Sequence, residues 1–491
     1  MTQATGNKGA EAQRYVVFIG CLVDTPALDQ LRIEPQGVLG VDRHTGRIIG
    51  RAAEQGESAT EWVRKWTDDA SVATGDIDRV QLAQGQFLMP GLIDTHTHAP
   101  QASFMGLGHD LPLMEWLATY TFKYESRFGD AQWARTMYES AVRRVVRNGV
   151  TMAAYYGTIH LEATCVLADV IGAIGQRARV GLVCMDANSP DYYMQTTADA
   201  LADTEAFVAR IQEGAVRGSG GLPLVGPIVT PRFVPSCSGA CLQGLGDLAR
   251  THDLPVQSHL CENPAEIEFA QSCFPDSAGY ADIYHRHGLL KPGSIMAHCV
   301  HMTDGDVDLV SASGAGVSHC PNSNLALTSG IADVRRLMGR GIPVGLGTDV
   351  GGGYSPSIID AMRMAAAANR ALLAVKRDRG DVLEGRDAVP LEFSEVLFLA
   401  TLGGARVMRM HDVVGSLDPG KLFDAIVVDL DVPASPVPSA AATPAVTEHP
   451  LTSAAAWRLR IEQFVFLADD RNISRVYVDG KLIHSLTVLC E

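Results

Sequence analysis

The sequence of 491 residues predicts an α/β fold in which short apolar strands alternate with amphipathic helices, between two β-rich ends. Helical patterns of apolar and polar residues cover residues 132–148, 198–213, 241–251 and 331–340. Apolar runs between the helices end at or near eight positions: His98, Tyr155, Asp186, Thr230, His259, His298, His319 and Asp349. Alternation of this kind makes the strands parallel, and eight strand–helix units predict a closed (β/α)₈ TIM barrel over residues 88–410.

The two ends of the chain predict a second, smaller domain. Strand patterns cover residues 14–22, 425–430 and 475–481, and the last of these closes on an Asp-Gly turn. We therefore expect a small β-sandwich domain formed jointly by residues 1–87 and 411–491. Within it, residues 433–455 are rich in Pro, Ala, Ser and Thr, which predicts a mobile surface loop.

Charge and composition indicate which kinds of molecule the protein can bind. The chain has 40 Lys and Arg against 56 Asp and Glu, and the net charge of −16 disfavours nucleic acid or an anionic membrane as the main partner. We recognise no targeting segment and no apolar run long enough to span a membrane. The ten cysteines form no CxxC pair, which favours reduced thiols. We expect a cytoplasmic protein that acts on a small molecule.

The most informative pattern is a pair of histidines two residues apart at the end of the first predicted barrel strand. Side chains alternate along a strand, so His96 and His98 lie on the same face and can bind one metal ion. His259 ends another apolar run and Asp349 ends a third. Because barrel enzymes have their active sites at the carboxyl ends of the strands, we expect these three histidines and one carboxylate to converge. Such a set is typical of a catalytic zinc or iron site with a position open for water.

Two further residues have suitable positions for acid–base chemistry. Glu262 follows the predicted ligand His259 by three residues and could act as general acid and base for a water activated by the metal. His298 ends the next strand and could orient that water or stabilise an oxyanion, or it could be an ordinary buried histidine. The fourth predicted strand, around residues 224–232, contains no lysine that could be carbamylated to bridge two metals. We therefore expect a single metal ion.

These residues resemble the amidohydrolase superfamily and, within it, the barrel-type guanine deaminases. The resemblance covers most of the chain, from about residue 86 to residue 429, and a further segment near 466–473. It rests on the motifs PGLIDTHTHAPQ (90–101), DLPLMEWL (110–117), TPRFVPSCS (230–238), SHLCEN (258–263), HCPNSNLAL (319–327) and GLGTDVGGGYS (345–355). The first and last of these mark the superfamily. The Ala-Pro-Gln sequence after His98 and the Pro-Arg-Phe segment point to the guanine-specific branch.

The resemblance implies hydrolytic deamination of guanine to xanthine and ammonia, in purine catabolism or salvage. It implies one Zn²⁺, with Fe²⁺ as the alternative, held by His96, His98, His259 and Asp349. It implies Glu262 as proton shuttle, with His298 and Asp349 beside the attacking water. Guanine would be contacted by Gln101, Arg232 and Phe233, and the resemblance also implies a homodimer. The residues that line the substrate site would be His98, Gln101, Arg232, Phe233, His259, Glu262 and Asp349.

Other functions remain open from the sequence. The same chemistry could act on 8-oxoguanine, cytosine, a triazine or a thio-adenosine, although Arg232 and Phe233 favour guanine because they offer charged donors and an apolar face. A metal-free scaffold related to the dihydropyrimidinases is a different class, and the complete set of ligand histidines argues against it. The zinc site of the cytidine deaminases is excluded, because no PCxxC motif follows His160-Leu161-Glu162.

Overall fold

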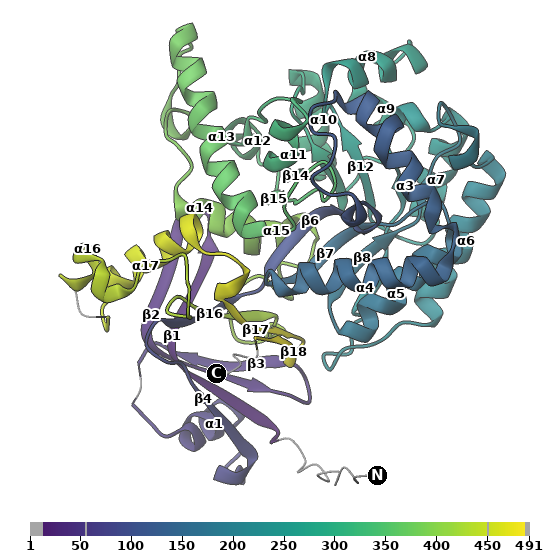
Figure 1. The fold of residues 1–491 in the computed structure, drawn as a ribbon. Helices are drawn as coiled ribbons and strands as arrows, with labels where there is room; N and C mark the ends of the chain where they lie inside the picture. Colours follow the sequence, from purple (N-terminus) through teal and green to yellow (C-terminus); the bar gives the residue numbers. More distant parts are fainter. Residues whose placement is uncertain (1–12, 55, 449–450, 487–491) are drawn as a thin grey trace.

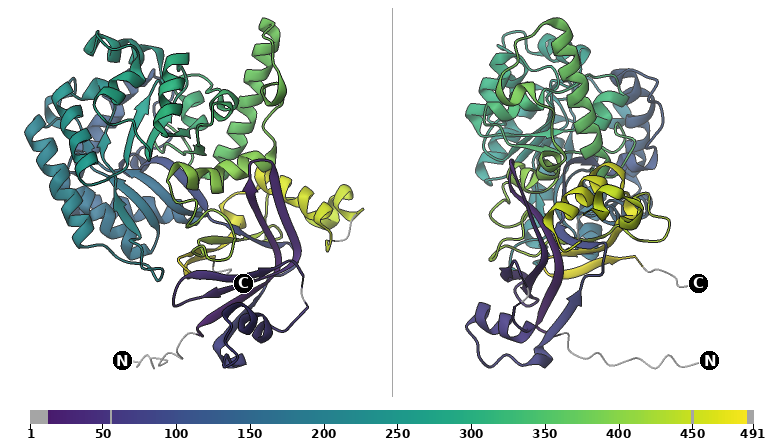
Figure 2. Two further views of the ribbon diagram at one scale, coloured as in Figure 1. Left: turned by 180° about the vertical axis from the view of Figure 1, so that it is seen from behind. Right: turned by 90° about the vertical axis from the view of Figure 1, so that its left-hand side faces the viewer.

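The protein is described by a computed structural model that covers residues 13–54, 56–448 and 451–486. Figure 1 shows two parts: strands surrounded by helices, coloured blue to green, and a sheet of purple and yellow strands beside them. Seen from behind in Figure 2, the N-terminal and C-terminal strands again lie together at one end of the helical part. The α/β architecture is of the TIM-barrel type, as the sequence predicts.

Parallel strands form the helical part. One sheet has the order β10-β8-β7-β6, another has the order β12-β13-β14-β15, and the short strands β9 and β11 pair with each other. A parallel bridge from Val229 to Val256 and a hydrogen bond from Thr95 Oγ1 to the Leu346 carbonyl (2.8 Å) join neighbouring sheets. The strands are β6 (Leu92–His98), β7 (Val150–Tyr156), β8 (Arg177–Gly181), β9 (Val183–Cys184), β10 (Val225–Pro227), β11 (Thr230–Pro231), β12 (Val256–Leu260), β13 (Ser294–His298), β14 (Gly316–His319) and β15 (Val344–Leu346).

Helices follow these strands along the chain. The longer ones carry apolar faces that pack on the strands, as α4 does through buried residues such as Tyr138 and Val142. The helices of this part are α2 (Leu113–Trp116), α3 (Phe122–Glu125), α4 (Ala131–Arg147), α5 (Leu161–Ile174), α6 (Thr197–Glu213), α7 (Gly239–Thr251), α8 (Pro264–Cys273), α9 (Tyr280–Arg286), α10 (Asp304–Ser313), α11 (Pro321–Ala326), α12 (Val334–Gly339), α13 (Ile358–Arg379), α14 (Phe393–Phe398) and α15 (Gly404–Val407).

Most predicted boundaries agree with these elements. The strands predicted to end at His98, His298 and His319 do so, and the strand predicted to end at His259 runs one residue further, to Leu260. Helices α4, α6 and α7 occupy the predicted helical segments. The prediction that a strand ends at Asp349 is wrong, because β15 ends at Leu346. Asp349 lies three residues further on, in the loop, with a left-handed φ of 46°. The predicted helix at 331–340 is shorter than expected, because Asp333 caps α12 through the backbone N–H of Arg336.

Both ends of the chain contribute to one eight-stranded sheet of order β18-β17-β16-β5-β1-β2-β3, with β4 paired to β1. Alternate residues of β1 face two different apolar cores: Val16 and Phe18 lie in one, and Tyr15 and Val17 pack with Val63 of α1 in the other. The elements are β1 (Tyr15–Ala27), β2 (Gln30–Asp42), β3 (Arg47–Ala52), α1 (Ala59–Thr67), β4 (Ile77–Gln81), β5 (Gln86–Pro90), β16 (Ala425–Asp429), β17 (Ile473–Val478) and β18 (Lys481–Ser485).

The predicted loop at 433–455 contains a short helix, α16 (Pro444–Thr447), and the start of α17 (Ala454–Leu467). Residues 449–450 of this segment lie outside the described residues, and its mobility stays a prediction. Among the described residues, no helix combines the length and the apolar character that crossing a membrane requires.

Candidate active site

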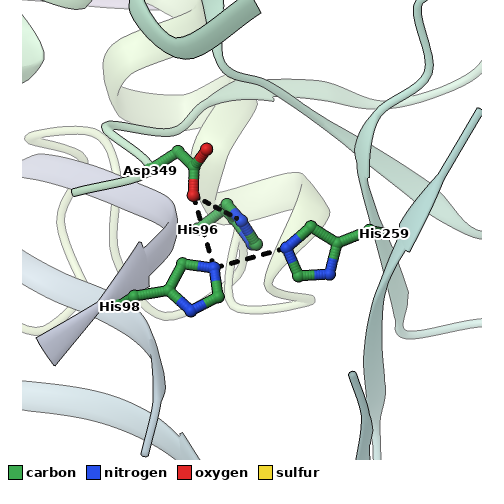
Figure 3. Close-up of side chains that lie close together, drawn as sticks. All are labelled: His96, His98, His259 and Asp349. Carbon is green, nitrogen blue, oxygen red and sulfur yellow. Dashed lines mark hydrogen bonds and ion pairs between the residues drawn. The ribbon is translucent and has the colours of Figure 1, made fainter. Parts of the chain in front are cut away.

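Four predicted ligands converge at the carboxyl ends of the strands. The Nε2 atoms of His96 and His98, both on β6, lie 3.1 and 3.3 Å from Oδ1 of Asp349. His259, at the end of β12, places its Nε2 atom 3.3 Å from that of His98 (Figure 3). One ligand atom from each of the four residues lies within 4.8 Å of the others, so a single metal ion fits among them.

The orientation of His259 is fixed from outside the cluster. Its Nδ1 atom donates to the backbone carbonyl of Arg232 at 2.6 Å. Because a carbonyl oxygen only accepts hydrogen bonds, the proton of the neutral ring resides on Nδ1 and the lone pair on Nε2. That lone pair points to the centre of the cluster, which is the arrangement that metal-binding histidines adopt.

The protonation states of the cluster suit a cation. Burial lowers the pKa of His96 to about 4 and lowers that of His259 well below its ordinary value, so both rings are neutral at neutral pH. Burial acts to raise the pKa of Asp349, but the nearby His96 outweighs it and holds this pKa well below its usual range. Neutral imidazole nitrogens and one carboxylate are the ligands that zinc and iron prefer.

Glu262 lies next to this cluster. Cys261 adopts a left-handed φ of 52°, and the chain turns there between His259 and Glu262 so that both side chains are buried at the same site. Burial raises the pKa of Glu262 to about 7. A carboxyl group with such a pKa exchanges protons readily at neutral pH, which is the property a general acid and base requires.

His298 faces both carboxylates. Its Nε2 atom lies 3.5 Å from Oε2 of Glu262 and 3.8 Å from Oδ2 of Asp349, while Nδ1 donates to Oδ1 of Asn324 at 2.8 Å. Burial acts to lower the pKa of His298, but Glu262 and Asp349 outweigh it, so this pKa is raised. A protonated His298 would offset part of the negative charge of Glu262 and Asp349.

A pocket opens beside the cluster. Seven of the nine predicted site residues line it, whereas His96 and His298 lie behind its wall. An apolar side is formed by Leu113, Trp116, Leu117 and Leu327. A pocket with one apolar wall and a few polar groups suits a flat heterocycle. The residues predicted to line the site are His98, Gln101, Arg232, Phe233, His259, Glu262 and Asp349.

Two functional residues escaped the sequence analysis. Glu125 of α3, fully buried, accepts hydrogen bonds from Arg232 and Gln101 behind the pocket. Asp94 of β6 accepts from the backbone N–H groups of His96 (3.2 Å) and Thr348 (3.0 Å). The sequence offers a weak signal for Asp94, which precedes the HxH pair on the same strand, and none for Glu125.

Comparisons with known proteins agree with this geometry. The amidohydrolase family profile matches residues 87–483. A probable guanine deaminase of Schizosaccharomyces pombe is 39% identical over 95% of this chain and 83% of its own length, and the guanine deaminase of Dictyostelium discoideum is 37% identical over 95% and 98%. The crystal structure of a guanine deaminase from C. acetobutylicum with bound guanine superposes with a TM-score of 0.81, at 30% identity, over 96% of this chain and all of that one. The chain therefore belongs to the amidohydrolase family, in the branch that contains the guanine deaminases.

Proposed function

We propose that this protein hydrolyses guanine to xanthine with release of ammonia, in purine catabolism or salvage. The observation that carries the proposal is the shared pocket: Glu262 and the His–Asp cluster line it together with Arg232, Gln101 and Phe233. Similarity to guanine deaminases over 95% of the chain supports the same substrate.

His96, His98, His259 and Asp349 would hold one metal ion, zinc or alternatively ferrous iron. When bound, the metal would supply the Lewis acidity that makes a water molecule nucleophilic near neutral pH. The chain's own contribution starts with Glu262, which takes a proton from the attacking water. A C–O bond then forms at the guanine carbon that bears the exocyclic amine, while the C2=N3 double bond of the ring opens and its electron pair moves to N3. Glu262 returns the proton to the exocyclic nitrogen. The electron pair on N3 then re-forms the ring double bond, the exocyclic C–N bond breaks, ammonia leaves, and the product is xanthine in its hydroxy tautomer.

The remaining site residues bind and orient. Arg232 supplies charged donors to the carbonyl oxygen of guanine, and Phe233 offers an apolar contact to the ring system. When protonated, His298 would stabilise the carboxylate form of Glu262, because its Nε2 atom lies 3.5 Å from Oε2 of Glu262. Buried apolar side chains that line the pocket, such as that of Trp116, exclude water from the purine ring.

The domain architecture, the oligomeric state and the cellular location of the enzyme are part of the same proposal. We propose that the strand segments close as a (β/α)₈ barrel over residues 88–410, and that residues 1–87 and 411–491 form a β-sandwich. We also propose a cytoplasmic homodimer, by analogy with the family.

The test is ammonia and xanthine production from guanine by the purified, zinc-loaded protein. Glu262→Gln should lower kcat by about 10³-fold, because general acid–base catalysis contributes in the range of 10² to 10⁴. Glu268→Gln makes the same chemical change at an exposed position of α8 and should leave kcat unchanged. Parallel assays with 8-oxoguanine, cytosine, a triazine and a thio-adenosine test the other substrates. A higher kcat/KM for any of them than for guanine would overturn the proposed substrate.

A further inference from the structure

Glu125 is a buried carboxylate that lies behind the substrate pocket and does not line it. It belongs to the short helix α3, 107 residues before Arg232 in the sequence. Its two oxygens accept hydrogen bonds from Arg232 Nη1 (2.7 Å), Arg232 Nη2 (3.3 Å), Gln101 Nε2 (2.9 Å) and Tyr193 OH (2.8 Å). Four donors use the full acceptor capacity of a carboxylate, so Glu125 has none left for a substrate.

The contact with Glu125 fixes which end of the Gln101 amide faces the pocket. A carboxylate accepts hydrogen bonds only, so the NH₂ group of Gln101 must point to Glu125. The amide oxygen, Oε1, then points away from it. No donor among the described residues bonds to Oε1, which lies against Gly351, where a side chain would collide with it. Because Gln101 lines the pocket and Glu125 binds its NH₂ group, the polar atom left to Gln101 for a substrate is a hydrogen-bond acceptor.

The same contact fixes Arg232 as a donor. Glu125 binds two of the five N–H groups of the guanidinium in a forked arrangement, and three remain. The ring of Phe122 lies 5.6 Å from the guanidinium carbon and limits its movement on another side. Burial acts to lower the pKa of Arg232, but the carboxylate of Glu125 outweighs this effect and raises it, so the side chain stays charged.

A neighbouring donor and acceptor complement one particular edge of a purine. The lactam edge of guanine carries a carbonyl oxygen at C6, which accepts, beside the N1–H group, which donates. An adenine-type edge reverses both roles, with an amino group at C6 and an unprotonated N1. Against Arg232 and Gln101 the reversed edge would place donor against donor and acceptor against acceptor.

We propose that Glu125 is a positioning residue that fixes the donor of Arg232 and the acceptor of Gln101, and thereby selects purines with a lactam edge over purines with an amidine edge. The inference rests on the proposed function for the identity of the substrate class. It adds a residue that touches no substrate and acts only through Arg232 and Gln101.

Binding of two unreactive purines tests selection without catalysis. Hypoxanthine has the lactam edge and adenine the reversed edge, and neither carries an amino group at C2. Calorimetry of the zinc-loaded protein should show at least about 10²-fold tighter binding of hypoxanthine, because mismatched buried polar groups discriminate strongly. Nearly equal affinities in the wild-type protein would overturn the proposal, and this measurement requires no variant.

Glu125→Gln is the direct test, since the new amide can donate to Gln101 and allow its amide group to turn. In this variant, the ratio of the Kd for adenine to the Kd for hypoxanthine should be at least tenfold smaller than in the wild type. It should also raise KM for guanine more than it lowers kcat. Glu125→Asp keeps the charge but is one methylene shorter. Its preference for hypoxanthine over adenine should lie between that of the wild type and that of Glu125→Gln. Glu139→Gln, exposed on α4, is the matched control and should behave as the wild type does.

The outcomes separate the two proposals. A folded Glu125→Gln protein with unchanged preference and unchanged KM would overturn the role of Glu125, while guanine deamination by the wild type would still stand. Wild-type protein that selects hypoxanthine but releases no ammonia from guanine would overturn the proposed reaction alone. If Glu125→Gln does not fold, Glu125→Asp and the wild-type affinities decide the question.

Discussion

The Nε2 atoms of His98 and His259 lie 3.3 Å apart, although the two residues are 161 positions apart in the sequence. The hydrogen bond from His259 Nδ1 to Arg232 leaves a lone pair on His259 Nε2 that faces His98. The two imidazoles lie close to each other and to the Asp349 carboxylate, and a shared cation would best satisfy all three groups.

Removal of the metal should therefore cost both activity and stability. Wild-type protein should contain about one metal ion per chain, and a chelator should abolish deamination and lower Tm, because an ion bound only by the folded state stabilises it. His259→Ala should lose most of the bound metal, as measured by elemental analysis. His285→Ala, at an exposed position of α9, should retain it. Full metal content in the His259 variant would contradict the ligand assignment.

The raised pKa of Glu262 predicts a stability that depends on pH. Burial raises this pKa from its ordinary 4.5 to about 7. The protonated form is favoured in the folded state, so the contribution is fully present below pH 4.5 and is lost as the pH rises to about 7. The loss amounts to about 3 kcal/mol at 1.36 kcal/mol per pKa unit. In metal-free protein, Glu262→Gln should raise Tm relative to wild type more at pH 8 than at pH 5.

Thermal melts of the wild type, Glu262→Gln and the exposed control Glu268→Gln at the two pH values check this expectation. The control should show the same pH dependence as the wild type. A difference in Tm between Glu262→Gln and wild type that is equal at pH 5 and pH 8 would show that Glu262 does not titrate in this range.

Asp94 is expected to support the metal ion without touching it. It accepts hydrogen bonds from the backbone of His96 and Thr348 and from Oγ1 of Thr348 at 2.5 Å, and so fixes the residues next to Asp349. Asp94→Asn replaces one acceptor oxygen with a donor and should weaken metal binding by about 10- to 100-fold. Competition with a fluorescent zinc chelator measures the affinity. An unchanged affinity would leave Asp94 with a role in folding only.

A buried ion pair joins the end sheet to the barrel strands. Arg177, the first residue of β8, donates to both oxygens of Asp424 at 2.8 and 3.1 Å, and both side chains are buried. Asp424→Asn should destabilise the protein by up to about 3–5 kcal/mol, because it removes the nearer of two buried counter-charges and leaves only Asp479, 3.7 Å from Arg177 Nη2. Asp247→Asn breaks the exposed pair with Arg250 and should leave the stability almost unchanged. Denaturant unfolding compares the two variants, and equal costs would contradict this expectation.

The parts of the site that the sequence predicts well are those encoded by local patterns. Four histidines lie at or within two residues of the ends of apolar strands, and parallel strands bring such ends together whatever the intervening helices are. They are His96, His98, His259 and His298. Asp349 was expected at a strand end but lies in the loop after β15, because a left-handed residue cannot continue a strand. The predicted convergence of Asp349 with the histidines nevertheless holds, because Asp349 lies only three residues after the end of β15.

Glu125 could not be predicted in the same way. Its neighbours Lys123, Tyr124 and Ser126 give the segment the polar character of an exposed helix, and glutamate is rarely buried unless it is paired. Its partner Arg232 directly follows β11, 107 residues later in the sequence, so only the tertiary fold reveals the pair. For the same reason, the sequence suggested Arg232 and Gln101 as substrate ligands without indicating what holds them in place.

Because β5 pairs with β16, the end sheet cannot complete its folding until late in translation. Gln86 and its partner Asp429 are 343 residues apart, so one side of β5 stays unpaired until nearly the whole polypeptide has left the ribosome. At 5–20 residues per second this interval lasts roughly 20–70 s. An open strand edge invites pairing with other chains, so we expect nascent molecules to need chaperone protection until the last strands emerge.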